Sequence, residues 1–427
     1  MSKFLSNLRR FLTRSKIPSS YGGSIDTNFS KFQEGDVVII NGRNPLLTKP
    51  LGRNKQTGVS RGVIQHNDII GRRPRDLVKA QKGPSYRITF PTLDEYATLS
   101  PRLVTPVYPA DANLIVSLLD IHTSVPSDQR EPDQPVEILE AGTGHGSLTL
   151  HLSRAINGAN TCPPPIPAHS QLKTIPENSS GEETKSSKRE GQQISDESSL
   201  NQEAWDSWRS GRRAIIHTVE ISAKHSAHAE KIIRAFRRGM YAGNIDFYVA
   251  SVENWIEEQT RRRSRSLFSG TLEPFLSYAI LDMPSAHLRI PHVSPILKVD
   301  GVLAVFMPNV TQIGDCVKII NDKRLPLVLE KAVELGTGIS SGRLWDIRMA
   351  VRRSRPVKTK EAEQPTGGEN GEESSGEVSE SKPQDVYTSA LAGEPQAGDP
   401  VLVCRPKVGE RIVGGGFVGL WRRINEQ

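Results

Sequence analysis

The chain has 427 residues, of which 36% are hydrophobic and 24% are charged, and its formal net charge at pH 7 is +7. This length accommodates two domains with solid cores and the linkers between them, and no apolar run approaches the length of a membrane span. The three cysteines, Cys162, Cys316 and Cys404, lie far apart and in no metal-binding spacing, which argues against a disulfide framework and for a reducing compartment.

The positive charge is concentrated at the N-terminal end. Residues 1–90 contain 17 Lys and Arg against 5 Asp and Glu, a net of +12, so the rest of the chain has a net charge of −5. A basic region of this kind indicates a polyanionic partner such as nucleic acid, and solubility or import would explain it equally well.

Residues 1–20 have the composition of a mitochondrial transit peptide. They contain five basic residues, several serines and no acid, and their apolar residues recur at helical spacing. A disordered basic tail or an RNA-contacting arm is the alternative interpretation.

Residues 31–90 predict a small β-barrel, because short alternating apolar runs are separated by glycine-containing turns. His66 and Asp68 lie between two of these runs. They form either a catalytic pair or a hydrogen-bonded turn, and the turn is the favoured interpretation.

A larger domain follows, starting with a short helix over 93–99 and a helical face over 114–119. A buried strand ending at Glu140, a glycine loop over 142–146 and a helix from Ser147 come next. Residues 160–211 contain too few apolar side chains to offset the entropy of ordering and predict a disordered insert.

From residue 213 onward, strands and helices alternate, which is typical of a mostly parallel sheet. An acidic stretch rich in Gly, Ser and Pro over 355–405 predicts a second disordered insert. We expect the strand before this insert to pair with the last strand of the chain, which gives the sheet an antiparallel end. The strands predicted here span residues 214–220, 245–249, 278–282, 302–306, 344–351 and 417–421.

The loop over 142–146 predicts a ligand site. Its glycines let backbone N–H groups approach a ligand, and the helix N-terminus behind them favours a negative group. A dinucleotide pyrophosphate and the amino-acid end of S-adenosylmethionine both fit. Glu220 ends the next strand, where a carboxylate can take both hydroxyls of a ribose, so we expect a nucleoside-containing cofactor.

Asp282 ends a further strand, and strand ends face the ligand in a doubly wound sheet. We therefore expect Asp282 to lie beside the group that the cofactor attacks, and the alternative is that it only caps the next helix. His287, five residues further on, either contacts the substrate or fills space.

Several of these motifs together resemble the tRNA (adenine(58)-N(1))-methyltransferase family. The sequence Glu-Ala-Gly-Thr-Gly-x-Gly-Ser-Leu beside Leu-Asp-Met is its most specific part, and the segments that start at Leu281 and Ala304 are most similar to the mitochondrial branch. The stretches that carry the resemblance are 62–71, 102–111, 140–148 and 281–311.

The resemblance implies a class I (Rossmann-like) S-adenosylmethionine-dependent methyltransferase domain over 91–427, interrupted by the two inserts. It also implies that the barrel at 31–90 contacts tRNA and that the product is N1-methyladenine at adenine 58 of the T loop. The family works as tetramers, either of one chain or of catalytic and non-catalytic tRNA-binding subunits. We expect the mitochondrial matrix as the location, with the nucleus as the alternative, and neither a metal nor a membrane partner.

The resemblance further assigns site residues position by position. It makes Asp282 the catalytic residue that faces the target adenine, and we expect His287 to contact the substrate. The residues expected to hold S-adenosylmethionine are Val107, Gly142, Thr143, Gly144, His145, Gly146, Ser147, Leu148, Glu220, His225, Ser251, Val252 and Asp282.

Two positions depart from the family pattern. Where the family has an Asp that reads the adenine amino group of the cofactor, this chain has Ser251, whose hydroxyl accepts a weaker hydrogen bond, and Glu253 is the alternative. His145 stands where the family often has a small residue, and we expect its side chain to point outward.

The implied chemistry needs positioning more than a base. Adenine N1 has a free lone pair, and a carboxylate at Asp282 would stabilise the positive charge that develops on the base. Three other functions stay open: a methyltransferase for another substrate, a non-catalytic tRNA-binding subunit and, less favoured, a dehydrogenase.

Overall fold

The computed structural model describes residues 23–124, 134–176, 196–266, 273–336, 345–351, 400–406 and 415–425. The chain divides into two compact units, Met1–Ile339 with Ile412–Gln427, and Ser340–Arg411. The expected transit peptide at 1–20 and most of the second expected insert lie outside the described residues.

The N-terminal β domain, residues 23–90, contains the small sheets expected for the barrel. One sheet has the order β2-β1-β6-β5, and the hairpin β3-β4 joins it through a bridge between Val63 and Gln81. Its core is a separate apolar cluster that includes Phe32, Ile64 and Ile88. The elements are β1 (Ile39–Asn41), β2 (Leu46–Leu47), β3 (Gln56–Gly58), β4 (Val63–Gln65), α2 (His66–Ile69), β5 (Leu77–Lys79) and β6 (Ser85–Thr89).

His66 belongs to the fold of this domain. Its ring is 2% exposed, Nδ1 accepts a hydrogen bond from the backbone of Gly52 at 3.1 Å, and Nε2 lies 2.8 Å from the Thr57 hydroxyl. Both ring nitrogens are therefore used to close a turn, which supports the structural interpretation of the His66–Asp68 motif.

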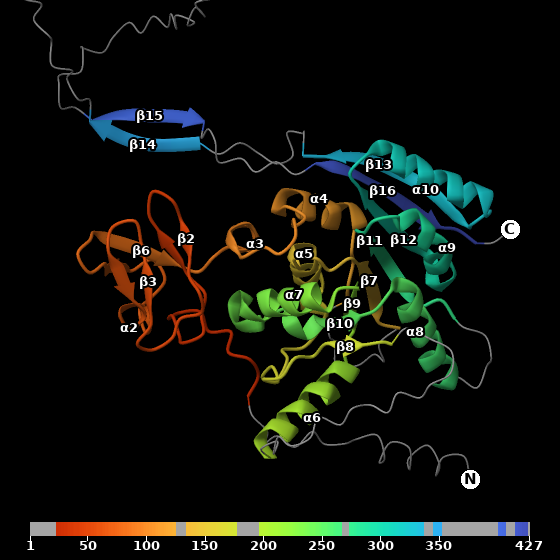
Figure 1. Cartoon of the computed structure of the whole chain (residues 1–427), viewed down its shortest axis with the longest axis horizontal. Coiled ribbons are helices and arrows are strands. Elements are labelled where there is room, and N and C mark those ends of the chain that lie inside the picture. The colour runs from red at the N-terminus through yellow and green to blue at the C-terminus, as the bar shows by residue number, and fades with distance from the viewer. Residues whose placement is uncertain are drawn as a thin grey trace, which may run out of the picture. The chain divides into compact units, whose positions relative to one another are not determined.

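The larger domain is built on an eight-stranded sheet of order β13-β16-β12-β11-β7-β9-β10-β8 (Figure 1). The strands from β12 to β8 are parallel, and β16 is antiparallel to both β12 and β13, which confirms the expected antiparallel end. The strands are β7 (Val136–Ala141), β8 (Lys173–Thr174), β9 (Ala214–Glu220), β10 (Ile245–Val249), β11 (Leu276–Leu281), β12 (Leu297–Met307), β13 (Leu327–Leu335) and β16 (Gly416–Arg423).

Helices cover both faces of this sheet (Figure 1). Successive strand residues point to opposite faces. In β7, Ile138 joins the apolar core shared with α4, α5 and α7, whereas Leu139 joins the core shared with α8, α9 and α10. The helices are α3 (Leu93–Leu99), α4 (Pro109–Leu119), α5 (Ser147–Ile156), α6 (Asp196–Ser210), α7 (Ala223–Ala235), α8 (Val252–Ser266), α9 (Ile290–Val293) and α10 (Val310–Asp322), with 3₁₀ turns η1 (Asn157–Ala159), η2 (Phe236–Gly239), η3 (Ala242–Asn244), η4 (Ala286–Arg289) and η5 (Ser294–Ile296).

The expected pairing of the strand over 344–351 with the last strand is wrong. β14 (Trp345–Val351) pairs with β15 (Pro400–Pro406) in the second compact unit, whereas β16 lies between β12 and β13 in the main sheet. β13 was not expected, because most of its side chains are exposed and it lacks a buried apolar face.

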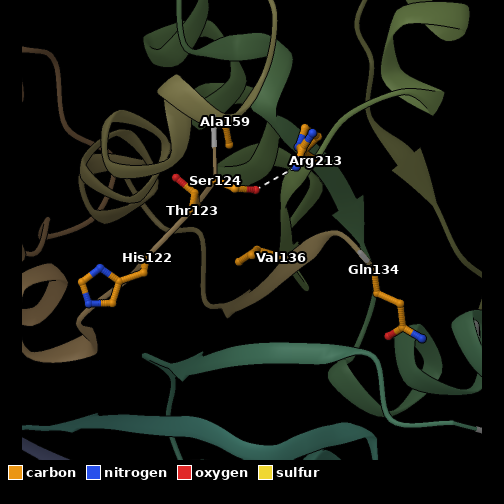
Figure 2. Close-up of a pocket in the computed structure, with 7 residues that line it drawn as sticks. All are labelled: His122, Thr123, Ser124, Gln134, Val136, Ala159 and Arg213. Carbon is orange, nitrogen blue, oxygen red and sulfur yellow. Dashed lines mark hydrogen bonds between the residues drawn. The ribbon is translucent and has the colours of Figure 1, made fainter. Parts of the chain in front are cut away.

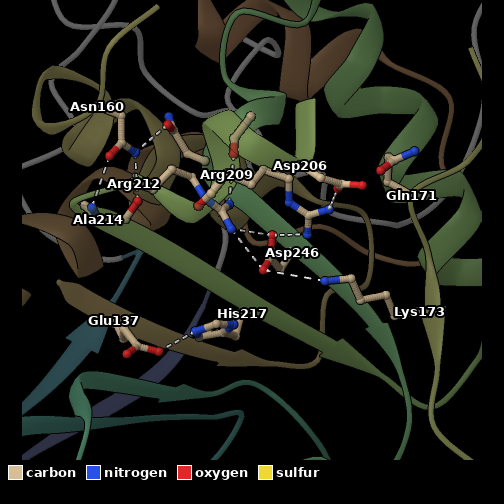
Figure 3. Close-up of polar contacts among 12 residues, drawn as sticks. Glu137, Asn160, Gln171, Lys173, Asp206, Arg209, Arg212, Ala214, His217 and Asp246 are labelled. Carbon is tan, nitrogen blue, oxygen red and sulfur yellow. Dashed lines mark hydrogen bonds and ion pairs between the residues drawn. The ribbon is translucent and has the colours of Figure 1, made fainter. Parts of the chain in front are cut away.

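Part of the first expected insert is structured, so the prediction of disorder is wrong for residues 160–176 and 196–211. β8 adds a short parallel strand to the edge of β10. Figure 3 shows Arg209, in the last turn of α6, and Arg212, just after the helix, converging with Lys173 on the buried carboxylate of Asp246 in β10. Their nitrogen–oxygen distances to Asp246 are 2.5, 2.9 and 3.9 Å. These ion pairs hold the insert to the sheet, together with Ile166 and Leu172, which pack against the core, and the buried Trp205.

Candidate functional site

The candidate site lies where the strand order of the sheet reverses. Going outward from β7, the chain continues to β9 and β10 on one side and to β11 and β12 on the other. Ligands of doubly wound sheets bind at the carboxyl ends of the strands at such a point. The segments after β7, β9 and β11 meet here, since Gly142 N donates to Val219 O and Asp282 N donates to Ala141 O, at 2.9 and 2.8 Å.

The glycine loop after β7 requires glycine for steric reasons. A Cβ on Gly142, whose φ is +96°, would lie 1.9 Å from the carbonyl oxygen of Asp282. Gly146, with φ +84°, is the N-cap of α5 and packs against Ala229 and Ile233 of α7. The loop therefore fits tightly against the β11 segment, so Gly142 is required by packing, apart from any ligand.

Glu220, at the end of β9, faces the glycine loop. Its Oε2 accepts a hydrogen bond from Gly144 N at 3.1 Å, and its Oε1 accepts one from Ser222 N at 3.0 Å. The side chain is 9% exposed. Each carboxylate oxygen has a second lone pair, so Glu220 can still accept hydrogen bonds from ligand hydroxyls.

Glu140, the last acid of β7, is the most buried carboxyl group of the site at 1% exposure. Its Oε2 accepts hydrogen bonds from the hydroxyls of Thr149 and Thr218, at 2.6 and 2.7 Å, and its Oε1 has no hydrogen-bond partner. Because Thr218 donates to Glu140, its hydroxyl accepts from Thr143, 2.7 Å away in the glycine loop. Burial raises the pKa of Glu140 to about 8, and the nearby carboxylates Asp282 and Glu220 add to the rise.

Asp282 follows β11 directly and is half-buried. Burial, together with the charge of Glu220, raises the pKa of Asp282 to about 7. A carboxyl group with a pKa near neutrality beside a ligand-binding loop is a candidate for catalysis.

A second side of the site comes from the segment before α4. Ser147, the first residue of α5, donates its hydroxyl to the carbonyl oxygen of Val107 at 2.7 Å. Leu148 is 4% exposed and belongs to the core below the loop. The structure therefore brings together Val107 and Ser147, two of the residues that the family resemblance assigns to the cofactor.

The other expected residues lie at the neighbouring strand ends. Ser251 caps α8, because its hydroxyl accepts from Asn254 N at 3.1 Å, and Val252 beside it is buried. They adjoin Glu220 through the hydrogen bond from Ala250 N to Glu220 O. His225 lies in the first turn of α7, and His287 lies half-buried in η4.

The expectation that the His145 side chain points outward is wrong. The ring is 2% exposed, and its Nε2 lies 3.1 Å from the Ser100 hydroxyl. Burial lowers the pKa of His145 to about 4, with His228 and Arg102 adding to the effect. The side chain turns inward because it joins the glycine loop to the segment after α3.

Sequence reasoning assigned no role to Glu140, Thr149 or Thr218. Glu140 was recognised only as an acid at a strand end. The available signal is a polar residue within a largely buried element, Glu140 in β7, Thr218 in β9 and Thr149 in α5, since such groups need partners inside the protein.

A cavity of about 160 Å³ lies elsewhere, beside the first residue of β7 (Figure 2). It is lined by Arg213, Ser124 and Val136, among others, and Arg213 donates to the Ser124 hydroxyl at 2.8 Å. This position is at the amino end of β7, so the cavity is separate from the glycine loop. Within the described ranges, no cluster of three potential metal ligands is present, and no helix combines the length and apolarity that a bilayer crossing requires.

Comparison with known proteins gives similarity to methyltransferases. No protein-family model matches the chain. The chain is 23% identical over 295 residues to the tRNA (adenine(58)-N(1))-methyltransferase TrmI from each of two strains of Thermus thermophilus, covering 69% of this chain and 81% of the relative.

One solved structure supports the methyltransferase similarity at the level of the fold. A SAM-dependent O-methyltransferase from Thermotoga maritima matches with a TM-score of 0.51 and 14% identity, over 93% of this chain and 96% of that one. The tRNA (m1A58) methyltransferase TrmI from Aquifex aeolicus has a TM-score of 0.47 and 14% identity, over 93% and 100% of the two chains. The Thermotoga match and the sheet topology confirm the Rossmann-like α/β fold of the S-adenosylmethionine-dependent methyltransferases.

Proposed function

We propose that the chain is an S-adenosylmethionine-dependent tRNA methyltransferase that forms N1-methyladenine at adenine 58 of the T loop. The observation that carries the proposal is the meeting of the glycine loop with Glu220 and Asp282 at the switch point of a methyltransferase-type sheet. The similarity to the Thermus TrmI proteins supports tRNA as the substrate.

The residues at this edge fit S-adenosylmethionine. The glycine loop would hold the methionine end, and Glu220, whose Oε2 already accepts from Gly144 N, can take the ribose hydroxyls. Oε1 of Glu140 has no hydrogen-bond partner in the protein. When bound, the sulfonium supplies an activated methyl group. Under this proposal, the remaining contacts come from Val107, Thr143, His145, Ser147, Leu148, His225, Ser251 and Val252, with the Ser251 oxygen using its second lone pair.

Asp282 is the proposed catalytic residue. Methylation at N1 makes the adenine cationic, so a carboxylate at its N1–C6–N6 edge stabilises the charge as it develops and can accept an N6 proton afterwards. A pKa of about 7 leaves Asp282 substantially ionised at neutral pH. His287, in η4 after Asp282, is the proposed contact for the rest of the target nucleotide.

The basic N-terminal β domain is the proposed RNA platform. Residues 31–90 contain 12 Lys and Arg against 4 Asp and Glu. All 12 basic side chains are exposed, and 11 of them lie between Arg43 and Arg87. Such side chains bind RNA through its phosphates. We also propose action in the mitochondrial matrix, or alternatively the nucleus, and assembly into a homotetramer or a heterotetramer with a non-catalytic tRNA-binding subunit.

The test is transfer of labelled methyl groups to unmodified tRNA, followed by mapping of the modified position. We expect one methyl group at the T-loop adenine. The Asp282→Ala variant should bind S-adenosylmethionine as the wild type does and lose about a hundredfold or more in turnover, because one aligned electrostatic group is removed.

The outcomes separate the alternatives. Binding of S-adenosylmethionine without transfer to any tRNA would point to a substrate other than tRNA. Absence of cofactor binding, with tRNA still bound, would point to a non-catalytic subunit.

A further inference from the structure

Two consecutive arginines after α7 have an unusual backbone conformation. Arg237 and Arg238 have φ of +48° and +55°, in the left-handed region that residues with a Cβ avoid. Strain of this kind persists only where surrounding contacts impose it, and it is often found at functional positions. The contacts that impose it here come from the N-terminal β domain.

Arg238 is held by a nearly buried carboxylate of that domain. Its Nε and Nη2 donate to the two oxygens of Asp36 at 2.7 and 2.9 Å, and Nη1 donates to Asp26 at 2.9 Å. The Arg238 side chain is 12% exposed and that of Asp36 is 1% exposed. The same guanidinium also donates to the backbone oxygens of Asn28 and Lys31.

Arg237 completes the contact with aromatic rings. Its guanidinium carbon lies 5.2 Å from the ring centre of Phe29 and 5.0 Å from that of Phe90, and its Nη2 donates to the carbonyl oxygen of Pro91 at 3.1 Å. A bidentate ion pair and a planar cation on aromatic faces are both strongly directional. Together they fix the orientation of the β domain on the end of α7.

The opposite end of α7 belongs to the cofactor site. Ser222 caps the helix and donates its backbone N–H to Glu220. In the middle of the helix, Nε2 of His228 lies 2.9 Å from the carbonyl oxygen of Pro101. α7 has 13 residues, which corresponds to about 20 Å of helix. α7 and the turn η2 after it therefore lead from the strand end that carries Glu220 to the two arginines that contact the β domain.

We propose that Arg238 is a positioning residue for the RNA substrate. Through Asp36 it sets the distance and direction from the basic β domain to the methyl-transfer site, so that RNA bound along the domain brings one particular nucleotide to Asp282. This inference rests on the proposed function, because it assumes RNA on the β domain.

The test compares Arg238→Gln and Asp36→Asn with the wild-type chain, using complete tRNA and S-adenosylmethionine. We expect both variants to raise the KM for tRNA by about tenfold, with the Kd for S-adenosylmethionine unchanged within about twofold. The pair of variants separates positioning from charge, since Arg238→Gln removes a positive charge and Asp36→Asn removes a negative one. A purely electrostatic effect on RNA binding would move KM in opposite directions.

Arg422→Gln is the matched control. Arg422 also pairs with two acids, Glu330 and Asp300, but at the β13–β16 end of the sheet, and its loss should leave the KM for tRNA unchanged. If the two main variants fail to fold, Asp26→Asn weakens the same contact at a carboxylate with 46% exposure, and should raise KM in the same direction.

An unchanged KM in folded variants, a KM that moves oppositely in the two variants, or a loss of cofactor binding alongside RNA binding would each overturn the proposal. Failure of the wild-type chain to methylate tRNA would instead overturn the proposed function, before any variant is compared.

Discussion

At the scale of single residues, three carboxyl groups surround the start of one glycine loop. Burial raises the pKa of Glu140 to about 8 and that of Asp282 to about 7, and Glu220 contributes to both shifts. Acids held away from their ordinary charge state reduce stability, and proteins keep them where function needs them. The positive charges of S-adenosylmethionine would offset the mutual repulsion of these acids.

Asp282→Asn should make the ligand-free protein more stable at high pH. The folded pKa is about 7 against 3.8 for the free side chain, so the folded state holds a proton that the unfolded state releases between these values. The free energy of unfolding of the wild type therefore falls as pH rises from about 4 through about 7. We expect the variant to melt roughly 3–5 °C higher at pH 8 and with a smaller advantage at pH 4, measured by thermal denaturation. An equal difference at both pH values would show that the carboxyl pKa is not raised.

Gly142→Ala should strongly weaken cofactor binding. The added Cβ would lie 1.9 Å from the carbonyl oxygen of Asp282, on a residue with φ +96°, so the loop and the β11 segment must separate. We expect the Kd for S-adenosylmethionine, measured by calorimetry, to rise by about a hundredfold or more. Gly158→Ala is the control, because a Cβ there meets no atom within 4 Å. Binding that survives in the Gly142 variant would place the cofactor elsewhere.

At the scale of elements, local patterns were predictable and long-range pairings were not. The sequence places α3 over the observed residues and locates the glycine loop, Glu220 and Asp282, because each follows from a short run of neighbours. The hydrogen bond from Thr218 to Glu140 joins residues 78 positions apart, and no local sequence pattern predicts it. The sequence pattern does not predict β13, because Val328 and Leu329 are 48% and 40% exposed and give it no buried apolar face. The strand depends instead on backbone pairing with β16.

The first insert, residues 160–211, shows the same limit of local patterns, since long-range ion pairs to Asp246 help to hold it in place. Asp246→Asn should destabilise the protein by about 3–5 kcal/mol, because Arg209, Arg212 and Lys173 would lose their buried counter-charge. Asp206→Asn is the matched control: Asp206 lies 3.7 Å from Arg209, but its side chain is 56% exposed, so we expect a loss below about 1 kcal/mol. Denaturant unfolding measures both, and equal effects would contradict a structural role for the buried cluster.

At the scale of the whole molecule, the N-terminal part of the chain has a positive net charge and the remainder has a negative one. The basic residues are concentrated in residues 1–90, whereas the remainder has a net charge of −5. A polyanion is therefore attracted to the N-terminal part and repelled, on average, by the part that carries the chemistry. Orientation of the RNA before contact would follow from this separation.

Replacing Lys49, Lys79 and Lys82 by Gln should weaken tRNA binding by about tenfold and flatten its dependence on salt, because fewer counterions are released. All three side chains are exposed on the β domain. The control replaces Lys318, Lys323 and Lys331, which are exposed on α10, the turn after it and β13, with the same change of charge. Filter binding across a salt series gives both slopes, and equal losses in the two triple variants would rule out the β domain as the platform.

The anchored insert has a consequence for how the polypeptide can be divided. β8 is paired to β10 on one side of residues 177–195, and α6 is ion-paired to β10 on the other. A backbone cut in that interval would give an N-terminal fragment that contributes β7 and the glycine loop, and a C-terminal fragment that contributes β9 and β11 with Glu220 and Asp282. Because β7 lies between β9 and β11, neither fragment holds a complete site, and recovery of cofactor binding on mixing would report their complementation.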